Sequence, residues 1–175
     1  VGELGYELFI PSEQATHVYD RIVEAGRPFG LQHAGGEQFA RISLEYFHHY
    51  DFDFLKVMND YYYPAPAGLD TVRTKQDLER FTTCDVERSE WREQFKALSI
   101  ITREIKGRAH FIDTVFDPWQ SIRRSVAGEN MEHLVQNEPE ALHAALEAVT
   151  QNLIAYARKA LEIGACKALG HGDQA

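Results

Sequence analysis

The chain alternates short apolar runs with longer segments whose apolar residues recur at helical spacing, and this alternation constrains the fold most. The clearest helix is expected from about Pro139 to Gly164, because proline stands in its first turn, glycine caps its end and its apolar face is broad. Apolar runs at 52–58 and 109–116 are typical of buried strands, and a helix is expected between them over 90–105. Strands separated by helices indicate βαβ units, so the sequence predicts an α/β fold with a parallel sheet.

The first 50 residues follow the same pattern on a smaller scale. A short strand is expected at 6–10, a helix from Ser12 to Gly26, a second strand near 29–31 and a helix over 37–50. At the other end of the chain, an apolar strand is expected after the last helix, but the residues that follow are mainly small or polar. The predicted sheet is therefore short by at least one strand, and its open edge could pair with a second copy of the chain.

Composition excludes several classes of function. The 175 residues include 27 acidic and 18 basic side chains, for a net charge of −9. Sequence-independent binding to nucleic acid and docking on an anionic membrane both need a basic surface, so neither is expected. Cys84 and Cys166 form no paired framework, and no apolar run approaches the ~20 residues that span a bilayer. We therefore expect a cytoplasmic protein that acts on a small molecule.

Carboxylates stand where the two central strands are expected to end. Asp60 follows the strand at 52–58, and parallel sheets present their reactive groups at that end. It could bind pyrrole or amide N–H groups or stabilise a developing cation, or it could simply cap a turn. Asp113 and Asp117 bracket the end of the next strand, and either could join Asp60 at the same edge.

Four further residues form a candidate substrate-binding set. Arg123 and Arg124 follow Trp119 on an expected helix and could contact substrate carboxylates, although an arginine pair of this kind can equally be a solvated helix face. Tyr61 opens an aromatic loop that could line a pocket or cover the core.

Motifs for metals and nucleotides are missing from the sequence. Adjacent histidines such as His48 and His49 point about 100° apart on a helix and cannot easily bind one ion together, so no metal site is expected. The sequence contains no GxGxxG, P-loop, GxSxG or HExxH motif. Nucleotide-dependent chemistry therefore has no support in the sequence.

The segment from Gly2 to Pro11, with the helix through Gly26 and the stretch 29–35, resembles the aminomethyltransferase family of the glycine cleavage system. In that family the glutamate of the GYE motif contacts folate, and Glu7 matches it. The family's next helix usually carries an arginine where Ser43 stands here, and the family's catalytic aspartate would lie before the first residue. The resemblance thus implies an incomplete folate site.

A longer stretch, about 37–165, resembles the uroporphyrinogen decarboxylase superfamily through residues 50–60, 111–119 and 138–165. This resemblance implies a truncated (β/α)8 barrel that removes carboxyl groups from a tetrapyrrole without a cofactor; cobalamin-dependent methyltransferases belong to the same superfamily. Asp60 matches the aspartate that holds the pyrrole nitrogens, whereas Arg124 stands where the decarboxylases have a tyrosine.

The leading interpretation is therefore a uroporphyrinogen-decarboxylase-like domain over 37–175, preceded by an aminomethyltransferase-like segment over 1–36. Its proposed catalytic residue is Asp60, its substrate is tetrapyrrole-like, no cofactor is expected, and the active site is expected to be incomplete. The alternatives are a folate-binding aminomethyltransferase-like fragment, a corrinoid-linked methyltransferase relative, and a non-catalytic α/β module or homo-oligomer.

Overall fold

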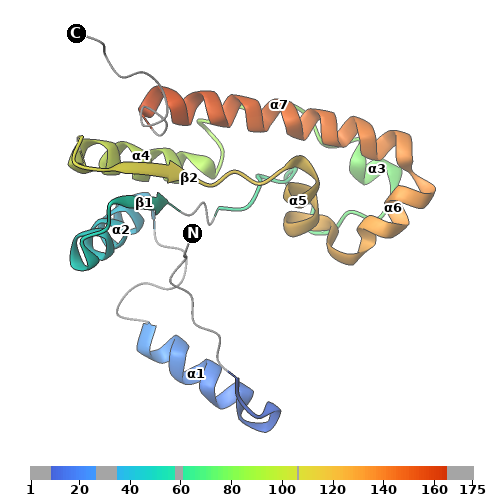
Figure 1. Ribbon diagram of the computed structural model, residues 1–175. Helices are drawn as coiled ribbons and strands as arrows, with labels where there is room; N and C mark the ends of the chain where they lie inside the picture. Colours follow the sequence, from blue (N-terminus) through green and yellow to red (C-terminus); the bar gives the residue numbers. More distant parts are fainter. Residues whose placement is uncertain (1–8, 27–34, 58–60, 106, 165–175) are drawn as a thin grey trace. The chain divides into compact units, whose positions relative to one another are not determined.

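The computed structural model describes residues 9–26, 35–57, 61–105 and 107–164, and it divides into two compact units, Val1–Ala34 and Gly35–Ala175 (Figure 1). The described part of the first unit contains a short 3-10 turn, η1 (Ser12–Gln14), and helix α1 (Ala15–Gly26). The expected helix over 12–26 is thereby confirmed. Of the strand expected at 6–10, only residues 9 and 10 are described, and they form no strand; the strand expected near 29–31 lies outside the described residues.

The second unit contains helices and two strands in alternation. In chain order its elements are α2 (Gly36–Tyr50), β1 (Phe54–Val57), α3 (Lys75–Leu78), α4 (Trp91–Ile105), β2 (His110–Asp113), α5 (Pro118–Ile122), a π-helical turn η3 (Arg123–Ala127), a 3-10 turn η4 (Gly128–Asn130), α6 (Met131–Asn137) and α7 (Pro139–Ile163). This composition confirms the α/β class. The (β/α)8 barrel stays a prediction, because two parallel strands are compatible with other α/β folds as well.

The two strands form a parallel pair, with Phe54 opposite His110 and Val57 opposite Asp113. Each has four residues, fewer than the apolar runs that predicted them. The reason is that an apolar run indicates burial, whereas a strand also needs a hydrogen-bonded partner at every position. The pairing of the two strands ends at Val57 and Asp113, and residues 114–117 continue as a loop.

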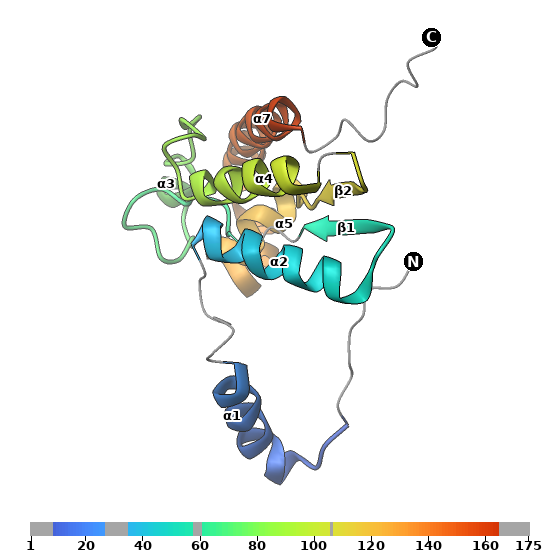
Figure 2. The same cartoon turned by 90° about the vertical axis from the view of Figure 1, so that its left-hand side faces the viewer.

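The two faces of this sheet differ. Leu55, Val57 and Phe111 are buried, and helices α2 and α4 lie together on one side of the strands (Figure 2). Phe54 and Ile112 alternate with these residues and are each 41% exposed, so the opposite face is open within the described part of the chain. The expected pairing of the open sheet edge with a second copy of the chain stays a prediction.

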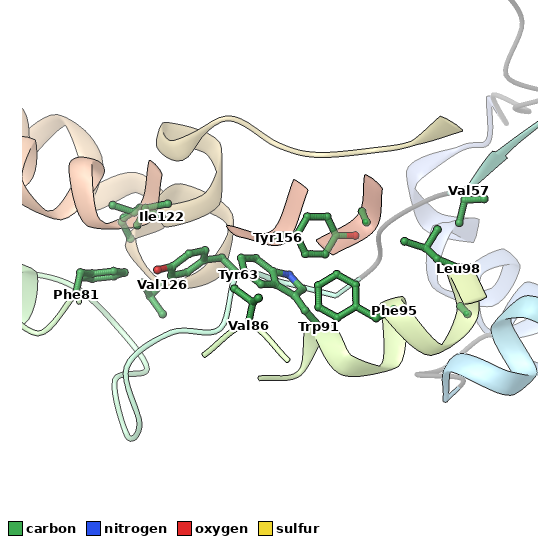
Figure 3. Packing of buried hydrophobic residues seen from close by; sticks show 14 of the residues in the cluster. Val57, Tyr63, Phe81, Val86, Trp91, Phe95, Leu98, Ile122, Val126 and Tyr156 are labelled. Carbon is green, nitrogen blue, oxygen red and sulfur yellow. The ribbon is translucent and has the colours of Figure 1, made fainter. Parts of the chain in front are cut away.

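The core lies where α4 crosses α7. The ring of Tyr156 on α7 stacks on Phe95 with 5.0 Å between centroids and lies 4.9 Å from Trp91 (Figure 3). Tyr63 packs edge-on against Trp91, and Phe81 stacks on Tyr63. Large buried rings contribute heavily to stability, so this aromatic cluster joins both helices to the loop after β1.

Local signals explain where the helices begin and end. The long helix α7 starts at Pro139 and ends before Gly164, as predicted, and Gly164 adopts a left-handed backbone with φ of 117°. At the start of α2, the backbone N–H of Gly36 donates to Glu93 Oε2 at 2.8 Å. A Cβ on Gly36 would lie 2.0 Å from the Glu93 carbonyl oxygen, so glycine allows α2 and α4 to approach closely there.

The segment between Asp70 and Cys84 is mainly polar, yet it contributes several core side chains. Its buried residues are Val72, Leu78 and Phe81, and the backbone N–H of Val72 donates to the Val126 carbonyl oxygen at 3.0 Å. The spacing of these residues is irregular, because their burial depends on packing against distant parts of the chain. Sequence periodicity could not reveal it.

Within the described ranges, no helix has both the length and the apolar character that crossing a membrane requires.

Candidate site at the carboxyl end of the sheet

Three segments meet beyond the carboxyl ends of β1 and β2, and we call residues 61–63, 114–119 and 123–125 the rim. The Thr114 hydroxyl donates to the carbonyl oxygen of Val57, the last residue of β1, at 3.5 Å. The Ser125 hydroxyl donates to the Tyr63 carbonyl oxygen at 3.3 Å. These contacts bring together the loop after β1, the loop after β2 and the π-helical turn. In parallel α/β proteins, ligands usually bind at this end of the strands.

Arg124 is held in place by an aromatic ring. Its guanidinium carbon lies 4.0 Å from the centroid of Phe116, and the side chain is exposed. A contact of this kind is worth roughly 0.5–1 kcal/mol at an exposed site. Among the described residues, neither Arg123 nor Arg124 forms an ion pair. In this part of the chain, no acidic side chain neutralises either guanidinium.

The other aromatic residues of the rim have different surroundings. Trp119, in the first turn of α5, is 37% exposed, and Tyr62 is 55% exposed. Tyr61 is half-buried and packs against the core, whereas Tyr63 is buried. Asn152 donates from Nδ2 to the Tyr63 hydroxyl at 2.6 Å, and burial raises the pKa of Tyr63 to about 12. The loop at 61–63 therefore covers the core with Tyr61 and Tyr63 and exposes the ring of Tyr62 to solvent.

Asp113 faces the helices rather than the open side of the sheet. Its Oδ2 accepts a hydrogen bond from the Tyr156 hydroxyl at 2.6 Å. Its Oδ1 accepts from Gln94 Nε2 and from the backbone N–H of Thr114, both at 3.0 Å. Burial raises the pKa of the Asp113 carboxyl, and burial also raises the pKa of the Tyr156 hydroxyl. This carboxylate joins α4, β2 and α7 and does not project into the rim.

Asp117 also serves the fold. Its Oδ1 accepts from the backbone N–H of Gln120 at 2.9 Å and so caps the start of α5. Asp113 and Asp117 were each expected to be able to join Asp60 at the strand ends. In the structure, both carboxylates accept hydrogen bonds from within the fold. Arg123 and Arg124 lie on the π-helical turn that continues α5, a type of turn often found at functional sites.

Two predicted residues, the catalytic Asp60 and the folate-contacting Glu7, lie outside the described residues, so both assignments stay predictions. His48 and His49 are exposed at the end of α2. In the described ranges, no group of three or more His, Cys, Asp or Glu side chains could hold a metal ion.

A separate groove lies between α2 and α4, lined in part by Leu44, His48 and Ile100. No rim residue lines this groove. It belongs to the helix layer and not to the strand ends.

The sequence interpretation missed the buried cluster around Asp113 and the ring of Phe116 beneath Arg124. One signal was present for the cluster: Gln94 occupies the same helical stripe as Trp91 and Leu98, where an apolar residue is expected. Gln94 is fully buried. A polar residue on the inner face of a helix indicates a buried hydrogen-bond partner.

Two comparisons relate the chain to known proteins. Residues 1–76 match the family model of the GCVT N-terminal domain, a range that includes α2 and β1 as well as the first unit. This match supports the aminomethyltransferase-like resemblance of the first residues, while the predicted domain boundary near residue 36 stays a prediction.

The fold is similar to that of a methyltransferase from Methanosarcina mazei, with a TM-score of 0.64 and 16% identity. The match covers 82% of this chain and 48% of that protein, so the chain spans about half the length of this structural neighbour. Neither comparison supports a uroporphyrinogen decarboxylase or a role in porphyrin synthesis. The chain thus has an α/β fold like that of a methyltransferase, and its first 76 residues are similar to the GCVT N-terminal domain.

Proposed function

We propose that this chain forms part of a protein that transfers a one-carbon group, methyl or aminomethyl, from one small molecule to another. The observation that carries the proposal is the fold likeness to a methyltransferase over 82% of the chain. The GCVT match points to the same class of chemistry, because the aminomethyltransferases handle one-carbon groups. The decarboxylase hypothesis has no comparable support and stays a prediction.

In such a transfer, the bond from the donor to the carbon breaks as the bond from the acceptor to the carbon forms. The role of the rim in this transfer is to bind and orient the reactants. Arg124, fixed over Phe116, binds an anionic group of the ligand, and the neighbouring Arg123 adds a second positive charge. Trp119 and Tyr62 supply exposed rings against which the apolar part of a ligand packs.

Three residues named from the sequence also enter this proposal. Asp60 stands directly before the rim in sequence and is the candidate for a polar anchor of the reacting group. Tyr61, the next residue in the sequence, is half-buried against the core and so supports the loop from which Tyr62 projects. Glu7 contributes only if the acceptor is a folate.

Calorimetric titration of the chain with methylcobalamin, 5-methyltetrahydrofolate and uroporphyrinogen III tests the proposal. Binding of either one-carbon carrier supports it. Binding of the porphyrinogen alone would restore the decarboxylase hypothesis, and binding of none of the three contradicts the proposal.

A matched pair of variants then locates the binding site. Arg124→Ala should weaken binding of the carrier by roughly tenfold, or about 1.4 kcal/mol, because a charge-assisted contact is lost. Arg158→Ala removes an exposed arginine from α7, outside the rim, and should leave the affinity unchanged. Equal losses in both variants would assign the effect to net charge and contradict a site at the rim.

A further inference from the structure

A continuous series of contacts runs from the buried core to the exposed arginine of the rim. Tyr156, on α7, donates its hydroxyl to Asp113 at the end of β2. Asp113 in turn accepts from the backbone N–H of Thr114, the first residue of the loop that follows. Two residues further on, the ring of Phe116 carries the guanidinium of Arg124. Each member of this series contacts the next or is joined to it by a short piece of backbone.

The position of Asp113 makes it the centre of the series. Alternation along β2 turns its side chain toward the helices, where donors from α4 and α7 converge on it. The same carboxylate holds the N–H of Thr114, and the Thr114 hydroxyl reaches the last carbonyl of β1. The direction in which the chain leaves β2 therefore depends on the Asp113 carboxylate, which lies on the helix side of the sheet.

We propose that Asp113 is a positioning residue for the rim: it sets the path of residues 114–117, so that Phe116 holds Arg124 where a ligand can reach it. The purpose of this arrangement rests on the proposed function, but the contacts themselves do not. Asp113 acts from the helix side of the sheet and touches no ligand.

The hydrogen bonds of Asp113 make the position of the rim depend on whether its carboxyl group is protonated. Among the described residues, the groups in hydrogen-bond contact with its carboxylate are the Tyr156 hydroxyl from α7, the Gln94 amide from α4 and the N–H of Thr114. A proton added to Oδ2 can be donated to the tyrosine oxygen, because a hydroxyl both donates and accepts. The bonds from Thr114 and Gln94 then lose the negative charge that strengthens them. The loop to Phe116 is held less firmly as a result.

The signal of the Arg124 side chain reports this effect without any ligand. We would follow its Nε–H resonance by 15N NMR from about pH 3 to about pH 7, a range that contains the ordinary carboxyl values and those raised by burial. Loss of the peak in Arg124→Lys assigns the resonance. In the wild type the resonance should shift with a midpoint above 3.8, the ordinary value for aspartate, because burial raises the pKa of Asp113. A resonance that does not titrate would overturn the proposal.

Two substitutions of the same kind separate Asp113 from its neighbour. Asp113→Asn should abolish the titration, because the ionisable group is removed while its shape is kept. Asp117→Asn removes another carboxylate of the same loop, but asparagine caps a helix as well as aspartate does, so the titration should persist. The reverse result, with the titration lost only in Asp117→Asn, contradicts the proposal.

Tyr156→Phe gives an independent readout if Asp113→Asn does not fold. Without the tyrosine hydroxyl the carboxylate loses a donor that favours its charged form, so the midpoint of the Arg124 titration should move to higher pH. An unchanged midpoint contradicts the link. Because these measurements need no ligand, they can succeed where the titrations with one-carbon carriers fail, and the two proposals are tested separately.

Discussion

The interior between α4 and α7 and the rim at the strand ends both contain aromatic side chains, but these side chains have different surroundings. In the interior, the ring of Tyr156 packs against Phe95 and Trp91, and its hydroxyl donates a hydrogen bond to the Asp113 carboxylate. At the rim, Phe116 carries an exposed guanidinium and Trp119 faces solvent over part of its surface. The difference teaches that the neighbours of an aromatic ring, rather than its presence, decide whether it stabilises the fold or is free to bind a ligand.

The largest effect is expected from removal of the interior ring. Tyr156→Ala should lower the free energy of unfolding by about 3–5 kcal/mol, the usual cost of deleting a large buried ring. Trp119→Ala at the rim should cost well under half as much, since part of its surface is already exposed. Urea denaturation of both variants measures the difference. Similar losses in the two would remove the distinction between interior and rim.

Disruption of the close contact between α2 and α4 should lower the free energy of unfolding by a smaller amount. Gly36→Ala places a methyl group against the backbone of Glu93 and should cost about 1–3 kcal/mol, as overpacking does. Gly35→Ala is the matched control, because the nearest atom to a Cβ there is a flexible carboxylate oxygen at 3.6 Å. Thermal unfolding compares the pair, and a stable Gly36→Ala would show that α2 and α4 can separate without cost.

The pH dependence of stability tests the cluster that joins the two regions. Because the folded-state pKa of Asp113 is raised by burial, the folded protein holds its proton more tightly than the unfolded chain does. The contribution of Asp113 to stability is therefore greatest below the unfolded value and declines as pH rises through the raised value. The free energy of unfolding of the wild type minus that of Asp113→Asn should fall with rising pH. A difference that rises with pH would mean that the hydrogen bonds outweigh burial.

The smallest effect on stability is expected at the rim itself. Arg124→Ala removes one exposed cation–π contact and should change the free energy of unfolding by no more than about 0.5–1 kcal/mol. Its effect on binding of a one-carbon carrier should exceed its effect on stability. Chemical denaturation together with calorimetric titration gives both values for one variant. A large loss of stability would place Arg124 among the residues that support the fold.

Much of the helical structure could be predicted from the sequence, because the signals are local. The helices α4 and α7 have the expected bounds to within a residue or two, as periodicity and end signals such as Pro139 and Gly164 indicate. The strands β1 and β2 were predicted in the right places but too long, whereas residues 9 and 10 of the strand expected at 6–10 form no strand. The burial of Val72 and Phe81 was missed, since it depends on packing against remote segments.

For the candidate site, the sequence named residues but not their arrangement, and their roles stay predictions. The sequence indicated that Arg123, Arg124 and Trp119 follow a strand end. The structure places the turn of the two arginines beside the loop at 61–63, because the Ser125 hydroxyl donates to the Tyr63 carbonyl oxygen. The ring beneath Arg124 could not be foreseen, because Phe116 lies eight positions away in a part of the chain with no regular repeat.

By itself, the sequence determined the α/β class, the order of the elements and the main helix ends, since spacing and capping act over a few residues. Tertiary structure alone decided which way Asp113 faces and what it does. The same aspartate at a strand end could bind a ligand or brace the fold. Its role follows from Gln94 on α4 and Tyr156 on α7, donors from helices 19 and 43 positions away. Only folding brings those donors to the carboxylate, because hydrogen bonds depend on distance in space and not along the chain.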